Sequence, residues 1–238
     1  MTTSQHIAWK RIFVEGAAIV ASILLAFTID AWWQQRGEHE QAATLVVNLT
    51  DDFTTNQQEL ERVLSEHSLN FQAATAFLEA TSETELGGDI TIPMAQVIGV
   101  VMGPTFSPTT AALDIVFSSG KIDLIEESKL RNALALWRQK VADNAEEEMD
   151  LRNLGQESLL PTLSKQVRFG KFLNSETIRD WRAGTSDNVY FDQEVRLTVN
   201  SELEGLLSER VFLANFVVEE LSQIGEIQER ILGLLREY

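Results

Sequence analysis

The chain has 238 residues, of which 36 are acidic and 19 basic, and it contains no cysteine. The lack of cysteine excludes disulfides, thiol catalysis and thiolate metal sites. A formal net charge of −17 argues against binding to nucleic acids or to anionic lipid headgroups, because both carry negative phosphates. All but two of the acidic residues and all but three of the basic ones lie beyond residue 36, so residues 37–238 are more acidic than the chain as a whole.

An apolar stretch near the start of the chain, residues 12–33, has the composition of a transmembrane helix. Its uncharged core, residues 16–29, has 14 residues. As a helix this core is about 21 Å long, which is shorter than the hydrocarbon layer of about 30 Å. The apolar residues that flank the core extend it to 22 residues, provided that Glu15 and Asp30 lie near the two membrane faces.

Two alternatives for this stretch are a buried core helix and a cleaved secretory signal. A core helix is rarely apolar on every face for about four turns, and the stretch ends in Asp-Ala-Trp-Trp, where a signal peptide has small residues. Trp32 and Trp33 instead stand where the aromatic belt of a membrane interface is expected. The sequence therefore predicts a transmembrane helix over residues 12–35.

The basic residues around this helix predict its orientation. Lys10 and Arg11 precede the helix, whereas Arg36 follows it among acidic residues. Since Lys and Arg accumulate on the cytoplasmic side of a membrane, residues 1–11 are expected to form a cytoplasmic tail. Residues 36–238 then form an extracytoplasmic, periplasmic domain at a bacterial inner membrane.

A helical pattern without Gly or Pro continues over residues 38–84. Apolar residues recur there at threes and fours, as on one face of a long amphipathic helix. This stripe consists of Val46, Leu49, Phe53, Leu60, Val63, Leu64, Phe71, Ala74 and Leu78. The helix is expected to continue the membrane helix, with an interruption only near Gly37. Residues 87–93, with two glycines and a proline, predict a loop after it.

The middle of the chain predicts two further helices. Residues 94–102 form a short apolar segment whose state the sequence leaves open. The Ser-Pro pair at 107–108 predicts a helix start, with Ser as the cap and Pro at the first position, and Gly120 predicts the end of that helix. The next helix is expected over residues 126–160, where Pro161 breaks or kinks it.

This second helix combines an apolar inner face with an acidic middle. Its predicted inner face consists of Leu130, Leu134, Trp137 and Val141. The acidic run consists of Glu146, Glu147, Glu148 and Asp150 and is interpreted as a solvated helix face. Residues 170–192 are interpreted as short elements and turns. Trp137 and Trp181 are both expected to be core residues.

The helical pattern returns over residues 191–236 and is close to the heptad period. Its stripe consists of Leu203, Leu206, Leu213, Val217, Leu221, Ile224, Ile231 and Leu235. It is long enough to pair with the first soluble helix along most of its length. These elements predict an all-α protein, in which one N-terminal transmembrane helix precedes an elongated up-and-down helical bundle with long coiled-coil-like helices.

Two stretches resemble a bacterial family of uncharacterised single-pass membrane proteins. The first, FVEGAAIVASILLAFTIDAWWQQR, has Gly and Glu at the start of an Ile/Leu/Ala-rich span and Trp at its end. The second shares a helix ending in Ser-Gly, a Leu-Ile step, and a helix opening with Leu-Arg and carrying an aromatic residue. Here these positions are Ser119, Gly120, Leu124, Ile125, Leu130, Arg131 and Trp137. The chain differs from the family pattern in the order of Glu15 and Gly16 and in Asp30, where an amide is usual. The resemblance implies a membrane-anchored helical domain and leaves the function open, because the family has no established activity.

Glu15 and Asp30 are the charged residues of the predicted span. A carboxylate at the edge of the hydrocarbon layer costs several kcal/mol unless it is neutralised, paired or hydrated. The two residues lie 15 positions apart. They are therefore about 22 Å apart along the axis and cannot pair within one helix. Either both are interfacial residues, or one of them faces a partner helix, where it seals an oligomer or carries protons.

Small residues on the predicted span favour assembly. Ala18, Ser22 and Ala26 lie at positions i, i+4 and i+8, a spacing that lets helix backbones approach closely in a membrane. The candidate membrane and assembly residues are therefore Glu15, Ala18, Ser22, Ala26, Asp30, Trp32 and Trp33.

The sequence predicts no catalytic, cofactor-binding or metal-ligating residues. His6, His39 and His67 are scattered along the chain. His39 lies between two glutamates, but consecutive helical residues point about 100° apart and cannot close on one ion. The sequence contains no G-x-S-x-G elbow, phosphate loop, dinucleotide fingerprint or H-E-x-x-H motif.

These observations favour a non-enzymatic membrane protein that acts, without a cofactor, as a scaffold or accessory subunit. It is expected to self-associate or to join a larger inner-membrane complex, with membrane lipid and protein chains as partners and no nucleic acid. Two alternatives remain open. One is an oligomer that conducts ions or protons by means of Glu15 or Asp30, and the other is an enzyme with an unrecognised site in the helical domain.

Overall fold

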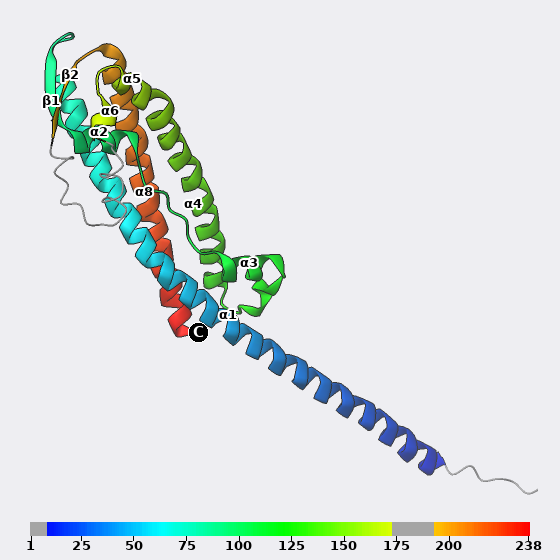
Figure 1. The fold of residues 1–238 in the computed structure, drawn as a ribbon. Helices are drawn as coiled ribbons and strands as arrows, with labels where there is room; N and C mark the ends of the chain where they lie inside the picture. The colour runs from blue at the N-terminus through cyan, green and yellow to red at the C-terminus, as the bar shows by residue number, and fades with distance from the viewer. Residues whose placement is uncertain (1–8, 173–192) are drawn as a thin grey trace, which may run out of the picture.

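One helix, α1 (Trp9–Ser82), runs without a break through 74 residues and dominates the molecule (Figure 1). The computed structural model describes residues 9–172 and 193–238, with side chains described for residues 13–170 and 193–238. At 1.5 Å per residue, α1 is about 110 Å long. The interruption predicted near Gly37 does not occur. A single glycine costs a helix only about 1 kcal/mol, and good helix formers lie on both sides of it.

The C-terminal half of α1 packs along α8 (Ser201–Glu237), which also packs against α4 (Ser128–Asn153) (Figure 1). α8 runs antiparallel to both of these helices. α1 and α4 therefore point the same way, so the chain has to return along the bundle between them. Residues 102–110 make this return in a segment without helix or strand, here called the crossover. The all-α prediction is confirmed, and so is the pairing of the first and last long helices.

Short elements occupy both ends of the bundle. They are β1 (Asp89–Pro93), α2 (Met94–Val101), α3 (Ala111–Ser118), the 3₁₀ helix η1 (Lys121–Leu124), the π-helix η2 (Leu154–Leu159), α5 (Leu160–Ser164), α6 (Phe169–Phe172) and β2 (Glu194–Thr198). β1 and β2 form an antiparallel pair in which Ile90 lies opposite Leu197. Both strands bury every second residue, so the pair covers one end of the bundle.

The structure corrects the predicted beginnings of two helices. The last helix begins at Ser201 and not near Phe191, because residues 194–198 form β2 and the side chain of Asn200 caps the helix by accepting a hydrogen bond from the Leu203 N–H. α3 begins at Ala111 and not at the Ser-Pro pair, which lies in the crossover. Asp52 on α1 accepts a hydrogen bond from the Ala112 N–H at 2.9 Å, so the capping group of α3 comes from another helix.

The predicted end of α3 and the predicted break after α4 have different outcomes. Gly120 follows the end of α3, as predicted, and has a φ of 70°, a left-handed conformation that is common for glycine just after a helix. The regular part of α4 ends at Asn153, but the junctions with η2 and α5 keep helical dihedral angles, so the helix does not break at Pro161. Pro161 itself lies at the start of α5, directly after the π-helical turns of η2.

Two apolar clusters fill the bundle. The proximal core, at the end nearest the N-terminal half of α1, contains Phe53 and Trp137, whose rings meet edge to face with centroids 4.8 Å apart. The distal core lies at the other end and includes Phe77, Met94 and Leu203. Most of the predicted stripe of α1 is buried in these two cores. Trp137 is a core residue as predicted, whereas Trp181 and the rest of the segment 173–192 lie outside the described residues.

Candidate functional site

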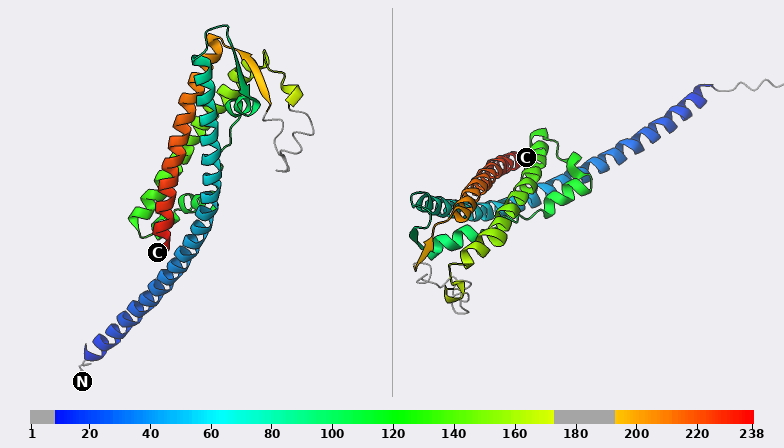
Figure 2. Two further views of the ribbon diagram at one scale, coloured as in Figure 1. Left: turned by 90° about the vertical axis from the view of Figure 1, so that its left-hand side faces the viewer. Right: turned by 90° about the horizontal axis from the view of Figure 1, so that it is seen from above.

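The N-terminal part of α1 projects beyond the bundle as a single helix (Figure 2). Every side chain over residues 13–36 is exposed, including those of Ile19, Leu24 and Phe27. Within the described residues, α1 is the one helix long and apolar enough to cross a membrane, and none of its most apolar 18-residue window is buried. An apolar surface of this length needs a cover, and the described part of the chain supplies none.

The small residues of this segment lie on one face of the helix. The hydroxyl of Ser22 donates to the carbonyl oxygen of Ala18 at 2.8 Å, so its polar group is satisfied within the helix. Ser22 therefore offers a neighbouring helix a small, neutral surface in line with Ala18 and Ala26, and close approach of backbones is the interaction that this face favours.

Polar and amphipathic groups mark both ends of the exposed segment. The rings of Trp32 and Trp33 meet edge to face with centroids 5.3 Å apart, and the guanidinium of Arg36 lies 5.9 Å from the Trp32 ring centroid. This group has the amphipathic character of a membrane interface. Glu15 and Asp30 are exposed near opposite ends of the segment, so the structure does not bring these two carboxylates together.

A buried polar layer, which the sequence analysis missed, separates the proximal and distal cores. It consists of His67 on α1, Glu148 on α4 and Arg210 on α8, and each of these residues is at most 3% exposed. Both carboxylate oxygens of Glu148 lie 3.1 Å from the backbone N–H nitrogen of Phe106, which donates to them, and His67 Nε2 lies 3.4 Å from Glu148 Oε1. The interpretation of the acidic run as a solvated face is therefore wrong for Glu148.

Arg210 joins three segments through their carbonyl groups. Its Nη1 donates to Leu151 O at 2.7 Å, and its Nη2 donates to Met102 O at 3.0 Å and to Gly99 O at 3.3 Å. Gly99 and Leu151 belong to the last turns of α2 and α4, where the helix dipole favours a cation. Burial lowers the pKa of Arg210 to about 10, which still leaves the side chain charged at neutral pH.

The polar layer has a structural role. It fixes the beginning of the crossover, at Met102, to α8 and its middle, at Phe106, to α4. Farther along, the amide of Asn56 exchanges two hydrogen bonds with the backbone of Thr109, at 2.8 and 2.7 Å. The crossover contributes few buried apolar side chains, so these polar contacts from the helices hold it in place.

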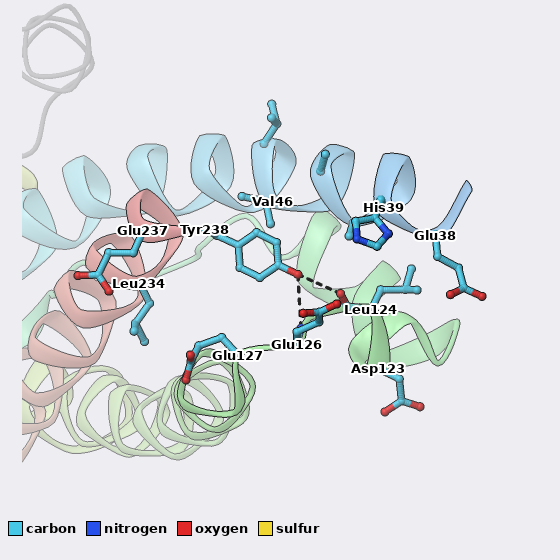
Figure 3. A pocket seen from close by; sticks show the side chains of 13 residues that line it. Glu38, His39, Val46, Asp123, Leu124, Glu126, Glu127, Leu234, Glu237 and Tyr238 are labelled. Carbon is cyan, nitrogen blue, oxygen red and sulfur yellow. Dashed lines mark hydrogen bonds between the residues drawn. The ribbon is translucent and has the colours of Figure 1, made fainter. Parts of the chain in front are cut away.

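A cavity of about 980 Å³ lies at the end of the bundle nearest the exposed part of α1 (Figure 3). α1, the residues from η1 to the start of α4, and the end of α8 surround it. Tyr238 reaches across it: its hydroxyl donates to Leu124 O at 3.1 Å and accepts from the Glu126 N–H at 3.4 Å. His39 lines this cavity, but among the described residues no group of three or more His, Asp or Glu side chains is placed to hold a metal ion.

No protein-family model, curated protein or solved structure matches the chain. The resemblance to a family of single-pass membrane proteins therefore stays a prediction. The structure places its second stretch at the end of α3, where Ser119 and Gly120 follow the helix, and in the first turn of α4, which contains Leu130 and Arg131.

Proposed function

We propose that the chain is a membrane-anchored helical scaffold or accessory subunit. The observation that carries this proposal is the continuous exposure of residues 13–36 on a helix that extends without a break into the bundle. Lipid and neighbouring helices are the surroundings that such an apolar segment requires. The basic residues Lys10 and Arg11 on the N-terminal side favour a cytoplasmic N-terminus and a periplasmic bundle at a bacterial inner membrane.

The continuity of α1 supports a role in assembly. Because no loop separates the exposed segment from the bundle, the direction of the membrane helix also sets the direction of the bundle. Anchors that associate side by side therefore hold their bundles in a fixed arrangement above the membrane. We infer that the face formed by Ala18, Ser22 and Ala26 makes this association, either between copies of the chain or with another subunit.

Replacing Ala18, Ser22 and Ala26 together by leucine is expected to disperse the complex, because the larger side chains keep the helix backbones apart. The measurement is the particle mass and composition of the protein purified in lipid from its native membrane. The control is Val20→Phe with Leu24→Phe, which adds bulk to the opposite face and is expected to leave the mass unchanged. A triple variant with the wild-type mass and composition contradicts this assembly face.

The variants Glu15→Gln and Asp30→Asn are expected to leave both the particle mass and the ion permeability unchanged. In an assembly held by small residues, these carboxylates lie near the two membrane faces, where water solvates them. Ion and proton flux into liposomes that contain the purified protein is the measurement. A flux that the wild type supports and either variant abolishes contradicts the scaffold proposal and favours the conducting oligomer.

A further inference from the structure

The cavity at the membrane-proximal end of the bundle is acidic. Five carboxylate side chains line it, and they come from three parts of the chain: Glu38, Asp123, Glu126, Glu127 and Glu237. Its lining includes no Lys or Arg. The nearby Arg131 donates to the carbonyl oxygens of Ile125 and Glu126, so its charge is directed to the backbone. Carboxylates around a concave surface focus a negative potential, which attracts a cationic partner.

The cavity also has an apolar wall. Ala42, Val46 and Leu124 line it, together with Val47, which is 58% exposed, and Tyr238, which is 47% exposed. Figure 3 shows Val46 on α1, and Leu124 and Tyr238 on the segments across from it. An apolar wall beside an acidic rim is complementary to a segment that carries both apolar and basic side chains.

The position of the cavity restricts the source of its occupant. Glu38 lies five residues beyond Trp33, which is about 8 Å along a helix, and Val47 lies about 21 Å beyond it. The site therefore opens just outside the expected membrane interface. Anionic headgroups are repelled by its charge, and a second copy of this chain presents the same acidic surface to it. These exclusions leave a different protein whose chain leaves the membrane beside α1.

We propose that this cavity is the docking site for a basic, amphipathic juxtamembrane segment of a different membrane protein. The basic side chains of this segment face Glu38 and Glu126, and its apolar side chains contact Val47 and Leu124. The inference rests on the proposed function, because the proposed membrane anchor places the cavity just outside the membrane, next to the segment of the partner. It adds the chemistry of the partner, which the anchor alone does not define.

The test uses the full chain in nanodiscs of zwitterionic lipid, which do not attract a basic probe by charge, and empty nanodiscs give the binding to lipid that is subtracted. The probe is a labelled helical peptide of about 18 residues with Leu on one face and Lys on the other, and the control peptide carries Glu in place of Lys. We expect the basic peptide to bind and the acidic control peptide not to bind. Glu38→Lys with Glu126→Lys is expected to weaken its binding about tenfold or more, as is Val47→Asn, which removes an apolar contact without changing the charge.

Matched variants separate the cavity from the general acidity of the protein. Glu146→Lys with Asp150→Lys makes the same change of net charge on exposed positions of α4, and Leu69→Asn replaces an exposed leucine of α1 by the same polar, uncharged side chain. Both are expected to bind the peptide within about twofold of the wild type, since they leave the cavity intact. Equal weakening by the α4 variant, or unchanged binding to the cavity variants, overturns the docking site. Particle mass is measured in the absence of the peptide. It tests the assembly proposal independently of the docking site, which peptide binding tests.

Discussion

Replacing Arg210 by methionine is expected to lower the free energy of unfolding by about 3 to 5 kcal/mol. Methionine keeps much of the apolar volume but removes every donor, so the carbonyl groups of Gly99, Met102 and Leu151 each lose the hydrogen bond that Arg210 makes to them. It also removes the permanently charged side chain of the buried polar layer, which contains the carboxylate of Glu148 as well. Because the polar layer lies between the two cores, the loss is expected in a single cooperative transition of the bundle.

Urea unfolding of the full chain in lipid nanodiscs, followed by far-ultraviolet circular dichroism, measures this loss. Arg230→Met is the control, because Arg230 is exposed on the same helix and its replacement is expected to change stability by less than about 0.5 kcal/mol. Arg210→Lys retains the charge but has fewer donors, and should recover part of the loss. A loss below about 1 kcal/mol for Arg210→Met would show that the carbonyl contacts matter little for stability.

The long helices could be predicted because apolar residues that recur at helical spacing lie on the buried face of each helix. The stripe that begins at Val46 on α1 and the stripe on α8 both face the cores, and their lengths alone indicated that the two helices pair. The exposed apolar segment at the start of α1 was equally evident, because residues 16–29 are uncharged and apolar on every face of the helix. Local composition was sufficient for these elements.

The polar layer was missed because only apolar residues were followed along each stripe. His67 lies four residues after the buried Val63, and Arg210 lies between the buried Leu207 and Ala214. Glu148 likewise lies three residues before the buried Leu151. A charged or polar residue at a stripe position was the available signal, and on three separate helices it marked one layer of the bundle.

The remaining errors concern contacts between residues far apart in the sequence. The cap of α3 is Asp52, which is 60 residues away from the N–H group that it accepts from, so the local Ser-Pro pair predicted the wrong start. Each of the two strands has only five residues, and each is stabilised by the other across more than 100 residues. Local periodicity carries little information about such pairs.

Replacing Gly155 by alanine is expected to lower the free energy of unfolding by about 2 kcal/mol. Gly155 lies in η2 against the end of α2, where an added Cβ would stand 2.3 Å from the carbonyl oxygen of Val101. The obstacle is backbone and cannot rotate aside, so the helices must separate at a cost of about 3 kcal/mol, of which the better helix propensity of alanine offsets about 1 kcal/mol.

The separation should also displace the carbonyl groups of α2 and the crossover from Arg210, so Gly155→Ala and Arg210→Met should together cost less than the sum of their separate effects. Gly205→Ala on α8 is the control of opposite sign. Apart from its chain neighbours and the backbone of its own helix, no described atom lies within 4 Å of its added Cβ, and the variant is expected to raise stability by up to about 1 kcal/mol. The same urea unfolding measures all of these variants. If Gly155→Ala raised stability as Gly205→Ala is expected to, helix propensity alone would explain both effects. That result would contradict the close packing of η2 on α2.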